Sequence, residues 1–183
     1  MTDSITFTFN FVDAIAGVIL LVGILGGGFI GNYLYKRRPR NLALLCAITT
    51  SLGVIPTALM LNYPAQPAAL LPLFVIAFLS GILISVTGPN IYAMVLNVNA
   101  PETRGSIFSI FNLVDALGKG FGPVIISALI MSFGRLRAFN IANLFWLVCG
   151  LLLFFTVFTF ERDEKRLMEK LAQRAQEMRG AER

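Results

Sequence analysis

The sequence contains no histidine, little charge and only two cysteines. Without histidine, the chain cannot form an imidazole metal site or a serine–histidine nucleophile pair. Cys46 and Cys149 each fall inside an apolar stretch, so we interpret them as small buried apolar residues rather than as a disulfide or a zinc pair. Charged residues make up 14% of the 183 residues, against about 25% in an ordinary soluble domain. The composition therefore argues against a soluble domain.

Several motifs of catalysis are also missing from the sequence. We find no P-loop, no HExxH, no CxxC and no GxSxG pattern, and no apolar stretch carries a cluster of carboxylates. We therefore expect no enzymatic activity, no catalytic residue, no metal and no cofactor. The net charge of +5 could suggest a nucleic-acid partner, but the positions of the basic residues, described below, favour a membrane protein instead.

Five apolar stretches separated by short polar joints dominate what is present. A helix rises ~1.5 Å per residue, so about 20 apolar residues cross a hydrocarbon core of ~30 Å, and every stretch is long enough. We therefore predict an all-α multi-pass membrane protein with a transmembrane bundle over 11–160. The predicted spans are 11–34, 42–62, 68–97, 105–133 and 138–160.

The basic residues between the spans predict which side of the membrane each joint faces. Twelve basic residues lie in the first joint, the third joint and the tail after residue 160. Only two lie in the second and fourth joints together, and none lies in the segment 1–10. Basic joints stay on the cytoplasmic side. We therefore expect an extracytoplasmic N-terminal segment 1–10 and a charged, helical, cytoplasmic tail at 161–183.

Glycine and proline mark two spans. Gly23, Gly27 and Gly31 are spaced four apart and share one helix face, which favours a tight helix–helix seam, with a glycine-lined substrate path as the alternative. In the third span, the pair Gly88–Pro89 predicts a break or kink, either purely structural or lining a cavity.

The fourth span carries the polar residues of most interest. Asn112, Asp115 and Lys119 share one helix face, and Lys119 lies roughly 22 Å along the axis from Arg104 at the predicted cytoplasmic mouth. A charge at that depth does not face lipid, and Asp115 is its natural partner. Two interpretations stay open. The pair is either a structural ion pair that fixes or gates the helix, or a site for substrate or a proton in a central cavity.

Two stretches resemble the major facilitator superfamily. The sequence GGFIGNYLYKRRPR at 27–40 resembles the glycine-rich basic loop that follows the second helix of each six-helix half of these transporters. The sequence PETRG at 101–105, followed by FNLVDALGKGFGP at 111–123, resembles the joint and helix before the last span in spinster-like members.

This resemblance implies that the five spans correspond to helices eight to twelve of a twelve-helix transporter, an incomplete C-terminal bundle. Alternating access needs two bundles, so the chain would be a fragment that is inactive alone. Its implied partners are the lipid bilayer, the missing N-terminal half and an unknown small solute or lipid. The alternatives are a non-transporting membrane scaffold or assembly partner and, third, a membrane enzyme.

Overall fold

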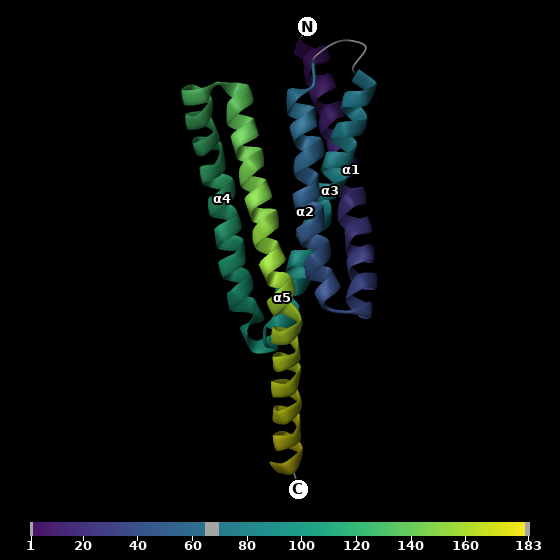
Figure 1. The fold of residues 1–183 in the computed structure, drawn as a ribbon, viewed down its shortest axis with the longest axis vertical. Helices are drawn as coiled ribbons and strands as arrows, with labels where there is room; N and C mark the ends of the chain where they lie inside the picture. Colours follow the sequence, from purple (N-terminus) through teal and green to yellow (C-terminus); the bar gives the residue numbers. More distant parts are fainter. Residues whose placement is uncertain (1, 65–69, 182–183) are drawn as a thin grey trace.

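The computed structural model describes residues 2–64 and 70–181, with the side chains of 17–64 and 70–180. Within these ranges the chain is helical and contains no strand. Five helices are long and apolar enough to cross a membrane, which confirms the prediction of an all-α multi-pass membrane protein. In chain order the elements are α1 (Thr2–Arg37), α2 (Arg40–Asn62), α3 (Leu70–Val98), the 3-10 turn η2 (Pro101–Thr103), α4 (Arg104–Phe133) and α5 (Arg135–Ala181) (Figure 1).

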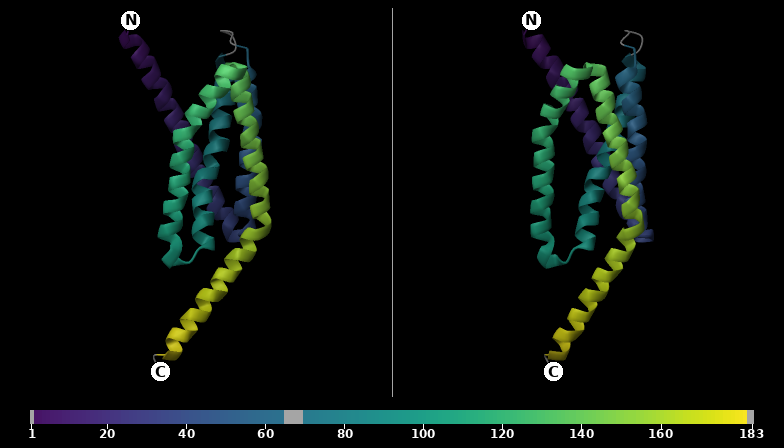
Figure 2. Two further views of the ribbon diagram at one scale, coloured as in Figure 1. Left: turned by 90° about the vertical axis from the view of Figure 1, so that its left-hand side faces the viewer. Right: turned by 60° about the vertical axis from the view of Figure 1, so that its left-hand side comes forward.

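The last helix is longer than the predicted span 138–160, because the charged tail continues it without a break. No glycine or proline interrupts 151–179, and Lys165 Nζ pairs with Glu161 Oε1 at 2.8 Å across one turn. The 47 residues extend about 70 Å, roughly twice the thickness of a hydrocarbon core. Figure 2 shows that the charged part of α5 projects beyond the end of the bundle.

The helix α2 lies at the centre of the packing. It contacts α3 and α5 most extensively, α1 packs mainly against α3, and α4 packs against α5. Figures 1 and 2 show α4 standing with α5 on one side of the molecule. No residue of α4 is buried, so this helix presents most of its surface to the surroundings.

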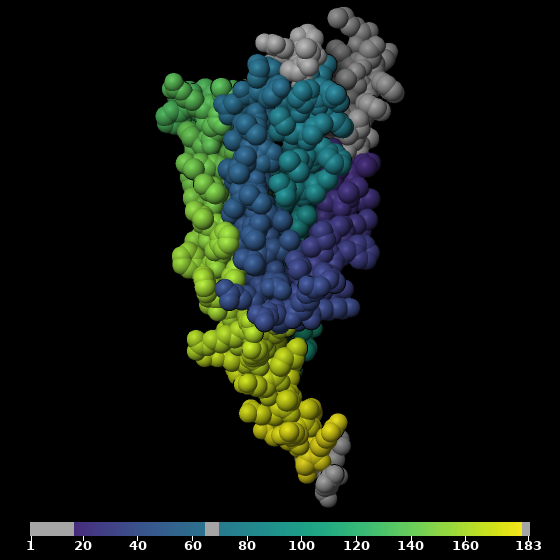
Figure 3. Space-filling model, turned by 45° about the vertical axis from the view of Figure 1, so that its right-hand side comes forward, coloured from purple at the N-terminus to yellow at the C-terminus, as the bar shows by residue number. Residues whose placement is uncertain are grey.

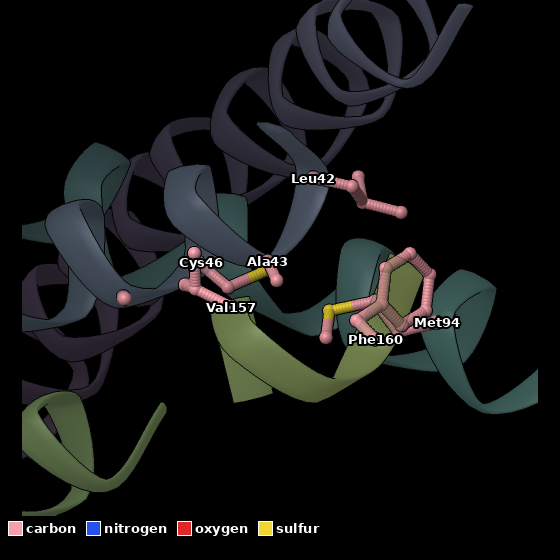
Figure 4. Close-up of a cluster of buried hydrophobic side chains, with 7 residues drawn as sticks. Leu42, Ala43, Cys46, Met94, Val157 and Phe160 are labelled. Carbon is pink, nitrogen blue, oxygen red and sulfur yellow. The ribbon is translucent and has the colours of Figure 1, made fainter. Parts of the chain in front are cut away.

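The core lies where α2, α3 and the end of the apolar part of α5 meet (Figure 4). Small residues on α2 let the neighbouring helices approach, and Met94 and Phe160 fill the remaining space. Cys46 is buried there as expected, whereas Cys149 is exposed, because an apolar stretch in a membrane helix can face lipid as well as the core. The cluster consists of Leu42, Ala43, Cys46, Ala47, Met94, Val157 and Phe160.

Hydroxyl and amide groups add contacts between α2 and its neighbours. Thr87 Oγ1 on α3 lies 3.1 Å from Thr49 Oγ1 and 2.9 Å from Thr50 Oγ1. Asn143 Nδ2 on α5 donates to the carbonyl oxygen of Val54 at 3.0 Å. Such bonds between helices contribute on average about 0.6 kcal/mol each in a membrane protein, so they orient the helices more than they stabilise them.

Candidate functional site

Gly23, Gly27 and Gly31 are buried on the face of α1 that packs against α3. A Cβ atom at Gly27 would lie 2.7 Å from Val86 Cα, which belongs to the backbone and cannot rotate away. At Gly23 and Gly31 a Cβ atom would overlap the side chain of α3 that lies opposite. Small residues permit this close approach in lipid, where no hydrophobic force drives two helices together. The structure thus brings these three predicted residues together along one helix contact.

Asn90 crosses the same contact, and sequence reasoning missed it. Its side chain is 2% exposed, and Nδ2 donates to the carbonyl oxygen of Gly27 at 3.0 Å and to that of Val86 at 2.8 Å. The signal was an amide residue inside an apolar span, one position after Pro89. A buried amide in such a place needs a partner on a neighbouring helix.

The helix α3 continues through Pro89 to Val98 instead of ending there. Packing against α1 and α2 supports the helix, and Asn90 Nδ2 adds a hydrogen bond to the carbonyl oxygen of Val86 one turn earlier. A cavity of about 290 Å³ opens beside the proline. It is lined by Gly28, Gly31, Asn32, Tyr35, Leu42, Pro89, Asn90, Ala93 and Asn97.

Asp115 and Lys119 form an ion pair on α4, with Lys119 Nζ 2.6 Å from Asp115 Oδ2. Their side chains are 43% and 77% exposed, and Asn112, one turn earlier, is exposed too. The pair is thus formed within one helix and stays exposed among the described residues, so both interpretations of it, a structural ion pair and a site in a central cavity, stay open. Lys119 lies about 22 Å from the start of α4 and about 21 Å from its end, near the middle of the helix.

An aromatic contact shows which side of α4 the ion pair occupies. Tyr92 on α3 stacks on Phe108 with ring centroids 5.7 Å apart and meets the edge of Phe111 at 4.9 Å. Residues 108, 112, 115 and 119 recur at helical spacing and share one face of α4. The ion pair therefore lies on the same face of α4 as Phe108, which contacts α3.

Arg104 lies at the beginning of α4 and is separate from the ion pair. Its Nε atom donates to the carbonyl oxygen of Asn99 at 3.2 Å, a bond that closes the joint between α3 and α4. Eleven residues, or about 16 Å of helix, separate it from Asp115. The structure thus places Arg104 at the end of the bundle, whereas Asp115 and Lys119 lie halfway along it.

A second contact that sequence reasoning missed joins α1 to α5. The Tyr35 hydroxyl donates to Oε1 of Glu164, and the Glu164 side chain is 5% exposed although it belongs to the charged tail. Glu164 follows the core residues Val157 and Phe160 at helical spacing, which was the available signal. In the part of the chain that the structure describes, no three acidic or cysteine residues come close enough to hold a metal ion.

One comparison with known proteins gives a match. The family model described as Major Facilitator Superfamily matches residues 1–180, a range that contains all five membrane-length helices. No curated protein and no solved structure matches the chain. The glycine contact of α1, the ion pair of α4 and most of the charged tail all lie inside the matched range.

Proposed function

The chain belongs to the Major Facilitator Superfamily, and on that premise we propose that it is the C-terminal portion of a secondary active transporter. The match over residues 1–180 carries this proposal. In the proposed register, α1 to α5 are helices eight to twelve, because the loop at 27–40 resembles the one that follows the eighth helix. The resemblance of 101–105 and 111–123 to spinster-like members supports that subfamily.

We assign the contact with a solute or a proton to Asn112, Asp115 and Lys119. The supporting observation is an ion pair halfway along a membrane-length helix whose charged groups remain exposed in the described bundle. Ionised groups at membrane depth face protein or water rather than lipid. In a complete transporter this face of α4 would border the central cavity. There the carboxylate can bind a proton or a cationic group and the ammonium can bind an anionic one.

The proposal requires a partner, because alternating access depends on two bundles that rock about a site between them. That partner is the N-terminal half of the transporter, and the chain alone does not transport. The sequence of the transcript upstream of Met1 tests this directly. We expect seven further apolar spans, including another glycine-rich basic loop. An in-frame stop codon just before Met1 would contradict the proposal and would favour a membrane scaffold. The feature that supports a scaffold is the charged part of α5, which projects from the bundle.

We propose that the N-terminus lies outside and the C-terminus in the cytoplasm, since the α1–α2 turn and the tail hold most of the basic residues. Cysteine substitutions at Arg38 and Pro64 test this orientation. A thiol reagent that cannot cross membranes should label Pro64→Cys in intact cells, and should label Arg38→Cys only after permeabilisation.

The unsubstituted chain is the labelling control, because Cys46 is buried and Cys149 lies in an apolar helix where a charged reagent does not reach. Labelling of both positions from the same side would overturn the orientation and the register that depends on it.

A further inference from the structure

Basic side chains from two distant parts of the sequence gather at one end of the bundle. Figure 3 shows the α1–α2 turn next to the beginning of the charged part of α5. All of the basic residues in these two segments are exposed. We call them the basic collar, which consists of Lys36, Arg37, Arg38, Arg40, Arg162, Lys165 and Arg166.

The buried contact between Tyr35 and Glu164 holds the two segments together. It also removes one of the three nearby carboxylates from the surface, because Glu164 is 5% exposed. Glu161 pairs with Lys165 at 2.8 Å, which leaves Asp163 as the third acidic residue. Seven basic residues against three acidic ones in 36–40 and 161–166 give the collar a clear positive excess.

Two arginines of the collar rest on aromatic rings that belong to the apolar surface. Arg37 Cζ lies 4.7 Å from the ring centroid of Tyr33, and Arg40 Cζ lies 5.6 Å from that of Phe158. Tyr33 is 56% exposed and Phe158 72% exposed, so both rings face the surroundings of the bundle. Tyrosine is enriched at the interface between membrane and water, and Tyr33 lies near the end of a membrane helix, shortly before both arginines in the sequence. The guanidinium groups are therefore held at the depth of the lipid headgroups.

We propose that the basic collar binds anionic phospholipids through their phosphate groups, with Arg37 and Arg40 as the principal contacts. A guanidinium group can donate two parallel hydrogen bonds to one phosphate, and the neighbouring aromatic surface accommodates the first part of the acyl chains. The proposal concerns the bundle itself and depends neither on transport nor on the proposed N-terminal half.

Lipid retention by the purified 183-residue chain tests the proposal. The chain is taken in detergent with equal amounts of phosphatidylglycerol and phosphatidylcholine of the same acyl chains, and bound lipid is counted by native mass spectrometry. We expect the chain to retain phosphatidylglycerol in preference to phosphatidylcholine. This preference should fall roughly 25-fold in the double variant Arg37→Gln with Arg40→Gln, because each cation contributes about fivefold. The matched control is Arg135→Gln with Arg137→Gln, two exposed arginines at the start of α5 and outside the collar, which should change retention little.

Two further arms use the unsubstituted chain, so the test does not depend on the folding of a variant. Raising the salt concentration from about 0.05 to about 0.5 M should weaken the retention of phosphatidylglycerol, because screening shortens the reach of exposed charges. Millimolar glycerol phosphate should not displace the lipid. Equal retention of the two lipids, an equal loss in the control variant, or complete displacement by glycerol phosphate would each overturn the proposal.

Discussion

Replacing Gly27 by alanine is expected to lower the free energy of unfolding by about 1–3 kcal/mol, the usual cost of overpacking a tight contact. The added Cβ atom would lie 2.7 Å from Val86 Cα, so α1 and α3 must move apart along the whole seam. That movement also lengthens the bond from Asn90 Nδ2 to the Gly27 carbonyl oxygen, now 3.0 Å. Reversible unfolding in mixed micelles, followed by circular dichroism, measures the change.

The neighbouring Gly28 offers a matched control, because nothing lies within 4 Å of the Cβ position there. Alanine at Gly28 should leave the stability unchanged or raise it slightly, since alanine favours a helix by up to about 1 kcal/mol over glycine. Equal stability of the two variants would mean that the seam between α1 and α3 does not form as described.

Neutralising either member of the Asp115–Lys119 pair is expected to reduce transport roughly tenfold or more in the complete transporter that we propose. Asp115→Asn removes the carboxylate that can bind a proton or a cation, and Lys119→Ala removes the opposing ammonium group. Each change also leaves the remaining charge without its partner at 2.6 Å. Uptake is measured as an initial rate and normalised to the amount of inserted protein.

Two controls separate contact with solute from a structural ion pair. The pair Glu161–Lys165 has the same spacing and a 2.8 Å contact, but it lies in the charged part of α5, so Glu161→Gln should leave uptake unchanged. Exchanging the charges, with Asp115→Lys and Lys119→Asp together, keeps an ion pair at the same place. We expect the exchanged protein to insert normally and still fail to transport. Normal uptake by the exchanged protein would show that the pair is only structural.

Local sequence predicted much of the candidate site. The spacing of Gly23, Gly27 and Gly31 placed them on one face, because helical periodicity depends only on neighbouring residues. The same argument placed Asp115 and Lys119 one turn apart on one face of their helix. The spacing could not predict that these glycines contact α3, because that contact depends on how α1, α2 and α3 pack against one another.

Asn90 and Glu164 illustrate the limit of that reasoning. Each is a polar residue whose burial comes from a residue more than sixty positions away, Gly27 in one case and Tyr35 in the other. Periodicity could show that Glu164 continues the stripe of Val157 and Phe160, but not that a tyrosine of α1 would meet it. Long-range pairs of this kind appear only when the helices are assembled.

The sequence by itself determined that this protein consists of long membrane helices. Crossing a bilayer requires an uninterrupted apolar segment whose backbone hydrogen bonds are all satisfied, and both requirements are met within one local segment. It also determined where charge is concentrated. Only the tertiary structure decided that α1 lies against α3, that the ion pair of α4 stays unburied, and that the two basic segments form one collar. Those outcomes depend on which faces of separate helices fit together, and the fit is a property of all the packed surfaces at once.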